Sequence, residues 1–141
     1  MTDRRVLIDT GPLVAIFSES DAQHHRCVEA LKVLHTPLFT CWPVITEAAW
    51  LLRERPHCLY QLFGGFASGM FSLLPLDAED LPHIAAIMRR YEDAGLQLAD
   101  AALVCLAERE NIRTVFTTDR RDFSLIRLKR NRPLMIVPAL Q

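Results

Sequence analysis

The segment at residues 6–17 constrains the fold of this chain more than any other. It begins with three apolar, β-favouring residues, which are too few for a helix and therefore predict a buried strand. The strand stops at Asp9, and Pro12, just inside a second apolar run, predicts the start of a helix. Ligands collect at the carboxyl ends of parallel strands, so Asp9 is either a site residue or a cap of the next helix.

Strand-like and helix-like segments alternate along the rest of the chain. Further strands are predicted at 37–41, 70–74, 114–117 and 134–137. Helices are predicted at 22–34, 44–53, 57–67, 77–91 and 96–110. Strands that alternate with helices pair in parallel, and no linker or internal repeat interrupts the order. The 141 residues therefore predict a single α/β domain over 1–141, with a mostly parallel central sheet of about four to five strands flanked by helices.

The composition is that of a globular protein, because 50% of the residues are hydrophobic and 23% are charged. A net charge of −1 gives no general argument for nucleic-acid binding. The four cysteines show neither a Cys-x-x-Cys pair nor zinc-ligand spacing, and the first residues make a poor signal peptide. Glycines, polar residues and a proline interrupt the uncharged stretch at 56–76, which argues against a membrane span. We expect a reduced, soluble protein of the cytoplasm that does not enter a membrane.

Isolated carboxylates recur at structurally similar places. Asp119 ends a predicted strand as Asp9 does, and Asp122 follows it on the same side of a helical turn. Glu47 and Asp100 stand among apolar residues near the starts of predicted helices. Each acid alone can be a helix cap or a dipole contact. Because strand ends and the helices that follow them lie at one edge of a parallel sheet, we expect these acids to converge on one pocket.

Such a pocket requires protons or cations. Two carboxylates 4 Å apart repel by roughly 4 kcal/mol at an effective dielectric of 20, and several such pairs would unfold a small domain. An all-oxygen donor set without His or Cys favours Mg²⁺ or Mn²⁺. A hard cation of this kind activates water and stabilises charge in phosphoryl chemistry, so the acids predict a metal-dependent hydrolase.

Four ordered motifs resemble those of the PIN-domain ribonucleases, and within them the VapC-type toxins of bacterial toxin–antitoxin pairs. The motifs are DTGPLVA at 9–15, TEA at 46–48, LADAAL at 98–103 and TTDRRDF at 117–123. The resemblance covers nearly the whole chain. It implies a three-layer PIN-like fold, Mg²⁺- or Mn²⁺-dependent endonuclease activity on RNA, a homodimer, and inhibition by a cognate antitoxin.

The resemblance also implies roles for individual residues. The implied catalytic acids are Asp9, Glu47, Asp100 and Asp119. The implied metal ligands are Asp9, Asp100, Asp119 and Asp122. Whether Asp119 or Asp122 meets the metal is left open by the spacing of the last motif. Thr10 and Thr118 match the small hydroxyl residues that support the site in this family.

A run of basic residues surrounds and follows the last acidic motif. It consists of Arg120, Arg121, Arg127, Lys129, Arg130 and Arg132. An acidic pocket repels RNA unless cations surround it, so we expect these side chains to contact phosphates just outside the metal site. The alternative is an ordinary solvated loop before the last strand. The sequence contains no base-reading motif that would specify the RNA.

Three other functions are compatible with part of the pattern. A haloacid-dehalogenase-like phosphatase also places an Asp after its first strand, but it needs a second Asp where this chain has Gly11. A PIN-fold housekeeping RNA-processing nuclease would share all the acids. A binding protein of the same fold would use a partner interface instead of catalysis, and divalent metal would then leave its thermal stability unchanged.

Overall fold

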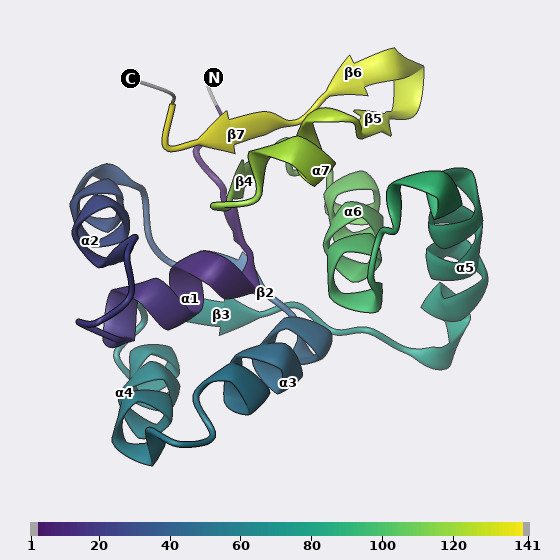
Figure 1. The fold of residues 1–141 in the computed structure, drawn as a ribbon. Helices are drawn as coiled ribbons and strands as arrows, with labels where there is room; N and C mark the ends of the chain where they lie inside the picture. The colour runs from purple at the N-terminus through teal and green to yellow at the C-terminus, as the bar shows by residue number, and fades with distance from the viewer. Residues whose placement is uncertain (1–2, 140–141) are drawn as a thin grey trace.

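The computed structural model, which describes residues 3–139, is an α/β fold built on a five-stranded parallel sheet (Figure 1). The sheet has the order β3-β2-β1-β4-β7. Its strands are β1 (Leu7–Ile8), β2 (Leu38–Thr40), β3 (Phe71–Leu73), β4 (Thr114–Phe116) and β7 (Met135–Val137). Each pairing is parallel, which confirms the predicted fold class and strand number.

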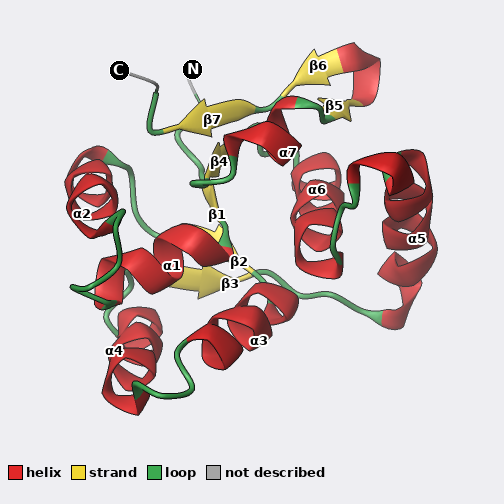
Figure 2. Ribbon diagram, in the orientation of Figure 1, coloured by secondary structure: helices red, strands yellow, loops and turns green. Residues whose placement is uncertain are grey.

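Within residues 3–139, seven α-helices flank the sheet (Figure 2). They are α1 (Thr10–Phe17), α2 (His24–Val33), α3 (Trp42–Leu51), α4 (Pro56–Ala67), α5 (Leu81–Arg90), α6 (Leu98–Glu110) and α7 (Arg120–Ser124). Short 3₁₀ turns cover Ala78–Asp80, Glu92–Ala94 and Lys129–Asn131. In Figure 1, α1, α2 and α4 lie on one side of the strands, and the packed pair α5 and α6 lies on the other.

Strand β1 occupies the centre of the sheet. Leu7 pairs with Phe39 of β2 on one side and Val115 of β4 on the other, and Ile8 pairs with Phe116. Leu7, Ile8 and Phe116 are at most 1% exposed. A continuous apolar strand of this kind is typical of a parallel sheet covered on both faces. The residue after Ile8 is therefore placed at the carboxyl edge of the sheet centre.

Helix α6 is the most buried helix of the fold. Its residues Ala99 and 101–107 are all buried, and many of them are small. The imidazole of His83 on α5 lies 3.0 Å from Glu108 Oε1 and 3.3 Å from Cys105 Sγ, which fastens α5 to α6. Small side chains let the helix approach its neighbours closely, as the sequence predicted.

Two interpretations of the apolar pattern are wrong. The many apolar residues at 44–53 favour a helix that is buried on most sides, yet Trp42, Trp50 and Leu51 of α3 are 63%, 63% and 54% exposed. The spacing of apolar residues in the predicted 77–91 helix places Leu81 on its inward face, but Leu81 is 58% exposed. The reason is that this segment begins as a 3₁₀ turn and α5 starts only at Leu81.

The segment before the last strand is not a plain loop. Arg127–Leu128 (β5) and Arg132–Pro133 (β6) form a two-stranded antiparallel hairpin separate from the main sheet. Leu128 is buried and packs toward α6, which anchors the hairpin. Arginines occupy most of the neighbouring positions, so the strand pattern was hidden in the sequence.

The four cysteines are free and buried. None of the helices between residues 3 and 139 has the length and apolar character needed to cross a membrane.

Candidate active site

Asp9 lies at the carboxyl end of the central strand, buried to 6% exposure. Its backbone N–H donates to the carbonyl oxygen of Phe116 at 2.9 Å, which extends the β1–β4 pairing by one residue. The hydroxyl of Thr117 donates to Asp9 Oδ2 at 2.8 Å. Asp9 stands at the N-cap position of α1, yet its side chain makes no capping hydrogen bond. The carboxylate is therefore hydrogen-bonded at the edge of the sheet and does not cap the helix.

Burial and neighbouring acids control the ionisation of Asp9. The pKa of Asp9 is raised from 3.8 to about 6, mainly by loss of hydration. Hydrogen bonds from the Thr10 backbone and the Thr117 hydroxyl oppose this rise, and the charges of Glu47 and Asp119 add to it. A carboxyl group whose charged form is disfavoured in this way needs a compensating cation when it ionises.

Asp100 occupies the first turn of α6 and has the same electrostatic character. Desolvation raises the pKa of Asp100 from 3.8 to about 7, and the charges of Asp9, Glu47 and Asp119 add to this effect. Its Oδ2 accepts a hydrogen bond from the backbone N–H of Gln97 at 3.3 Å, so it also caps the helix. The four predicted catalytic acids thus lie close enough to repel one another.

The two acids of the last motif have different neighbours. Asp119 is the N-cap of α7, and its Oδ1 accepts from the backbone N–H of Asp122 at 3.2 Å. Burial and the charge of Asp119 raise the pKa of Asp122. The charge of Asp119, in contrast, raises the pKa values of both Asp9 and Asp100. This favours Asp119 as the acid that faces the site.

Glu47 is exposed on α3, and it makes no hydrogen bond or ion pair with any residue of the described chain. It acts on Asp9 and Asp100 only through its charge. Among residues 3–139, no three acid, imidazole or thiol groups are gathered into a cluster that could hold a metal ion as they stand. The carboxylates share a region without enclosing a preformed cage.

The donors in this region nevertheless suit a hard cation. They are all oxygen atoms, and two of the carboxyl groups have pKa values raised by burial and mutual repulsion. The hydroxyl of Thr10, buried beside Asp9 in the chain, is the one buried side-chain polar atom of residues 3–139 that has no hydrogen-bond partner. A bound cation with its waters would satisfy such groups, so the residues fit Mg²⁺ or Mn²⁺.

Thr117 is the supporting residue that the sequence prediction did not include. Its hydroxyl donates to Asp9 and accepts from the backbone N–H of Asp119 at 2.9 Å, so it holds both acids. The hydroxyl of the predicted residue Thr118 lies instead against Gly11. A Cβ atom added at Gly11 would be 2.3 Å from Thr118 Oγ1. Thr117 is 1% exposed and Thr118 is exposed, but residues 115–117 are all buried, so strand alternation gives no signal that separates the two hydroxyls.

The predicted phosphate-contacting residues do not form one group. Arg120 Nη1 donates to the carbonyl oxygen of Pro138, and Arg127 Nη1 donates to the carbonyl oxygens of Ser124 and Ile126. Lys129 and Arg130 line a pocket at the C-terminal end of α6, whereas Asp100 lies at its N-terminal end. Their expected position just outside the metal site is therefore wrong. Arg121 is exposed and next to Asp122 in sequence, and its contact with phosphate stays a prediction.

Comparison with known proteins agrees with this geometry. A family model described as the PIN domain matches residues 6–129. Ribonuclease VapC26 of Mycobacterium tuberculosis is 32% identical over 124 residues, which cover 86% of this chain and 92% of the relative.

Solved structures of low sequence identity share the fold. VapC20 of Mycobacterium tuberculosis, described as a sarcin–ricin loop cleaving toxin, superposes with a TM-score of 0.75 at 15% identity, covering 83% of this chain and 92% of that one. A toxin–antitoxin complex from Klebsiella pneumoniae gives a TM-score of 0.67 at 17% identity, covering 86% and 92%. VapBC2 of Rickettsia felis, bound to a promoter DNA fragment, gives 0.64 at 16% identity, covering 93% and 97%. The family-model match and the identity to VapC26 show that this chain belongs to the PIN-domain family and, within it, to the VapC ribonucleases.

Proposed function

We propose that this protein is a Mg²⁺- or Mn²⁺-dependent endoribonuclease. The observation that carries the proposal is the buried carboxylate of Asp9, which Thr117 holds at the sheet edge within the charge field of Glu47, Asp100 and Asp119. The name of its relative VapC26, a ribonuclease, supports RNA as the substrate.

Each acid has a distinct part in the proposed site. Asp9, Asp100 and Asp119 would hold the cation, with Asp122 beside Asp119 as a further oxygen donor. A bound Mg²⁺ or Mn²⁺ supplies an activated water and positive charge for the reacting phosphate. Glu47, exposed at the edge of this group, is able to orient water and accept its proton. Arg121 would contact the phosphate backbone near the cut.

Cleavage assays on total RNA test the proposal directly. We expect the wild-type protein to cut RNA with Mg²⁺ or Mn²⁺ and to lose this activity in a chelator. Asp9→Asn and Asp100→Asn should abolish cleavage and keep the fold, measured by circular dichroism. Asp93→Asn, which changes an exposed acid in the turn before α6, is the matched control and should cut as wild type does. Wild-type rates for the two site variants would contradict the assignment.

We propose in addition that the nuclease is the toxin of a toxin–antitoxin pair that acts in the cytoplasm. The support is membership of the VapC ribonucleases and the toxin–antitoxin complexes among proteins of similar fold. Expression alone should arrest growth, and co-expression with a small protein encoded next to it should restore growth. Growth unaffected by expression, with RNA cleavage intact, would favour a housekeeping nuclease instead.

A homodimer is the further assembly that we propose, formed through an α3–α4 apolar surface made by Trp50, Leu51, Tyr60 and Phe63. These side chains are 63%, 54%, 66% and 44% exposed. Exposed aromatic residues on adjacent helices are typical of interfaces. We assign this surface to a second copy of the chain, in line with the homodimer that the resemblance to PIN-domain ribonucleases implies.

A further inference from the structure

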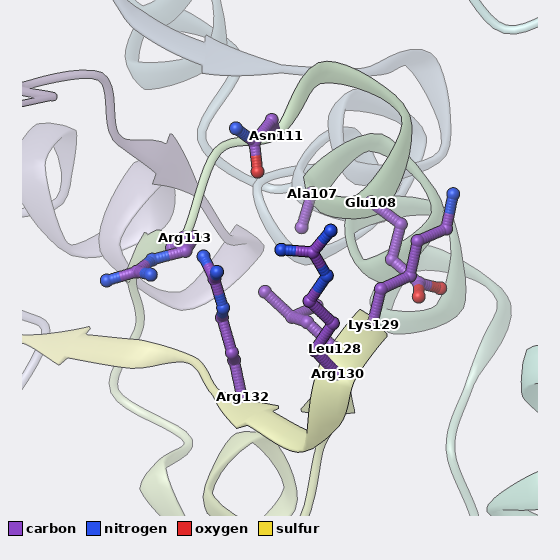
Figure 3. A pocket seen from close by; sticks show the side chains of 8 residues that line it. All are labelled: Ala107, Glu108, Asn111, Arg113, Leu128, Lys129, Arg130 and Arg132. Atoms are coloured by element: carbon purple, nitrogen blue, oxygen red, sulfur yellow. The ribbon is translucent and has the colours of Figure 1, made fainter.

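A basic pocket lies between the C-terminal end of α6 and the β5–β6 hairpin. Figure 3 shows its side chains, and its volume is about 320 Å³. The lining residues are Ala107, Glu108, Asn111, Arg113, Leu128, Lys129, Arg130 and Arg132. Four of the eight are cationic, although the whole chain has a net charge of −1. The pocket lining therefore has a net positive charge, although the chain as a whole does not.

The four cations are available to a ligand. In the described part of the chain, none of Arg113, Lys129, Arg130 and Arg132 forms a salt bridge or a side-chain hydrogen bond. All four are exposed. Exposed arginines without carboxylate partners present their N–H donors to an anion from solution, and phosphate suits their planar geometry.

The negative groups around the pocket are already engaged. Glu108 is the one acid that lines it, and its side chain is 7% exposed with Oε1 3.0 Å from His83 Nε2. The carbonyl end of α6 also carries partial negative charge. There Arg5 Nη2 donates to the carbonyl oxygen of Asn111 at 3.3 Å. The pocket therefore keeps an excess of positive charge.

The backbone of the β5–β6 hairpin determines where its arginine side chains in the pocket lie. Arg130 and Asn131 have φ values of 64° and 58°, a left-handed conformation that an arginine rarely adopts. In Figure 3 the guanidinium groups of Arg130 and Arg132 extend into the space below Asn111. The tight turn thus places two arginines from one hairpin against α6.

The shape of the charged region favours a polymer over a single small anion. A second pocket of about 380 Å³ shares Asn111, Arg113 and Arg132 with the first. It also contains Arg5, which is paired with Asp3 at 2.9 Å, so within the described chain Arg113 and Arg132 are the free cations that extend the charged region. This region is remote from the acids, because Asp100 and Asn111 lie eleven residues apart along α6, which corresponds to roughly 16 Å.

We propose that this basic pocket binds the phosphate backbone of the RNA substrate at a point remote from the carboxylates. The inference rests on the proposed ribonuclease function and adds a requirement for an extended RNA. The separation of roughly 16 Å between the two ends of α6 corresponds to several nucleotides of an RNA strand. A structured RNA would reach the pocket, whereas an oligonucleotide of a few residues would not.

Cleavage kinetics of the double variant Arg130→Ala/Arg132→Ala test the proposal. On a stem-loop RNA we expect a several-fold rise in KM with kcat unchanged. Two lost phosphate contacts should reduce the slope of log affinity against log salt by about 1.8 on duplex RNA. On an oligonucleotide of a few nucleotides the same variant should match the wild type. A matched control, Arg89→Ala/Arg90→Ala on α5, removes the same charge from exposed positions and should leave KM and slope unchanged.

The outcomes separate this inference from the proposed function. Wild-type KM and salt slope for the pocket variant on stem-loop RNA would overturn the pocket, even with full nuclease activity. An equal loss in the α5 control would overturn it too, because the effect would be one of net charge. If the wild-type protein cut no RNA, the affinities of the wild type and the pocket variant for the same stem-loop would still test the pocket. Weaker binding by the pocket variant alone would support the pocket while the nuclease assignment failed.

Discussion

The Thr117 hydroxyl joins the ends of two adjacent parallel strands by donating a 2.8 Å hydrogen bond to Asp9 Oδ2. The same oxygen accepts the backbone N–H of Asp119 at 2.9 Å. One buried hydroxyl therefore orients two of the candidate metal ligands, which lie 110 positions apart in the chain.

Thr117→Val is expected to disturb both acids. It leaves the buried Asp9 oxygen without its donor, and it should cost about 1–3 kcal/mol of unfolding free energy. Since the lost bond favours the ionised carboxylate, the pKa of Asp9 should also rise further. Urea denaturation and cleavage assays measure the two effects. Thr117→Ser should restore both, and Thr114→Val on the same strand should change neither; a Thr117→Val protein as stable and active as wild type would contradict this role.

Asp9→Asn is expected to stabilise the metal-free protein at neutral pH. Burial raises the pKa of Asp9 from 3.8 to about 6, so the folded state binds its proton more tightly than the unfolded state does. This contribution to stability is fully present below pH 3.8 and is lost as the pH rises through 6. At pH above 7, the variant should gain up to about 3 kcal/mol in a chelator. Denaturation across this pH range is the measurement, and a gain that grows toward acid pH would have the wrong sign.

Divalent cations are expected to reverse the difference in stability between the Asp9→Asn variant and the wild type. A cation held by Asp9, Asp100 and Asp119 stabilises only the folded state, by about 2.7 kcal/mol at 100 times its dissociation constant. Differential scanning fluorimetry should show the melting temperature of the wild type rising with Mg²⁺ or Mn²⁺. The Asp9→Asn protein should respond far less, and sodium at equal ionic strength should move neither. Equal shifts in both proteins would place the cation elsewhere.

Two adjacent glycines of α4 are expected to respond oppositely to alanine. A Cβ atom at Gly65 would lie 2.7 Å from two ring atoms of the buried Phe71, so Gly65→Ala should destabilise by about 1–3 kcal/mol. No atom lies within 4 Å of a Cβ at Gly64, so Gly64→Ala should gain about 0.5–1 kcal/mol from helix propensity. Chemical denaturation compares the two. The same sign for both would mean that close packing of α4 on β3 does not decide the outcome.

Trp50→Glu is expected to convert a dimer into a monomer. It places a charge in the centre of the proposed α3–α4 apolar surface, where desolvation would oppose association. Size-exclusion chromatography with light scattering gives the mass of each species. Leu81→Glu changes an equally exposed apolar residue on α5 and should leave the dimer intact. A monomeric wild type, or a variant that stays dimeric, would remove this surface from the assembly.

The strands and helices were largely predictable because the periodicity of apolar residues and the positions of proline and glycine indicate where each element begins and ends. The apolar run before Asp9 and the proline after it define β1 and the start of α1 without any tertiary knowledge. Convergence of the acids also followed from topology alone, since parallel strands end at one edge. The charges of Glu47 and Asp119 raise the pKa values of Asp9 and Asp100, but no three acids of residues 3–139 gather into a cluster that could hold a metal ion.

Features that depend on side-chain direction could not be predicted in the same way. Thr117 and Thr118 are neighbours with the same chemistry, and only the strand register decides which one reaches Asp9. Lys129 and Arg130 follow the last acidic motif closely in sequence, yet the β5–β6 hairpin carries them to the far end of α6. Proximity along the chain was a poor guide to proximity in space there.

The placement of β1 between β2 and β4 has a consequence for protein synthesis. Asp9 is synthesised 108 residues before Thr117 and 110 residues before Asp119. The central strand cannot acquire its second neighbour until residues 114–116 have also been made. During translation of the intervening segment, the nascent chain therefore holds Asp9 without the residues that orient it in the folded protein.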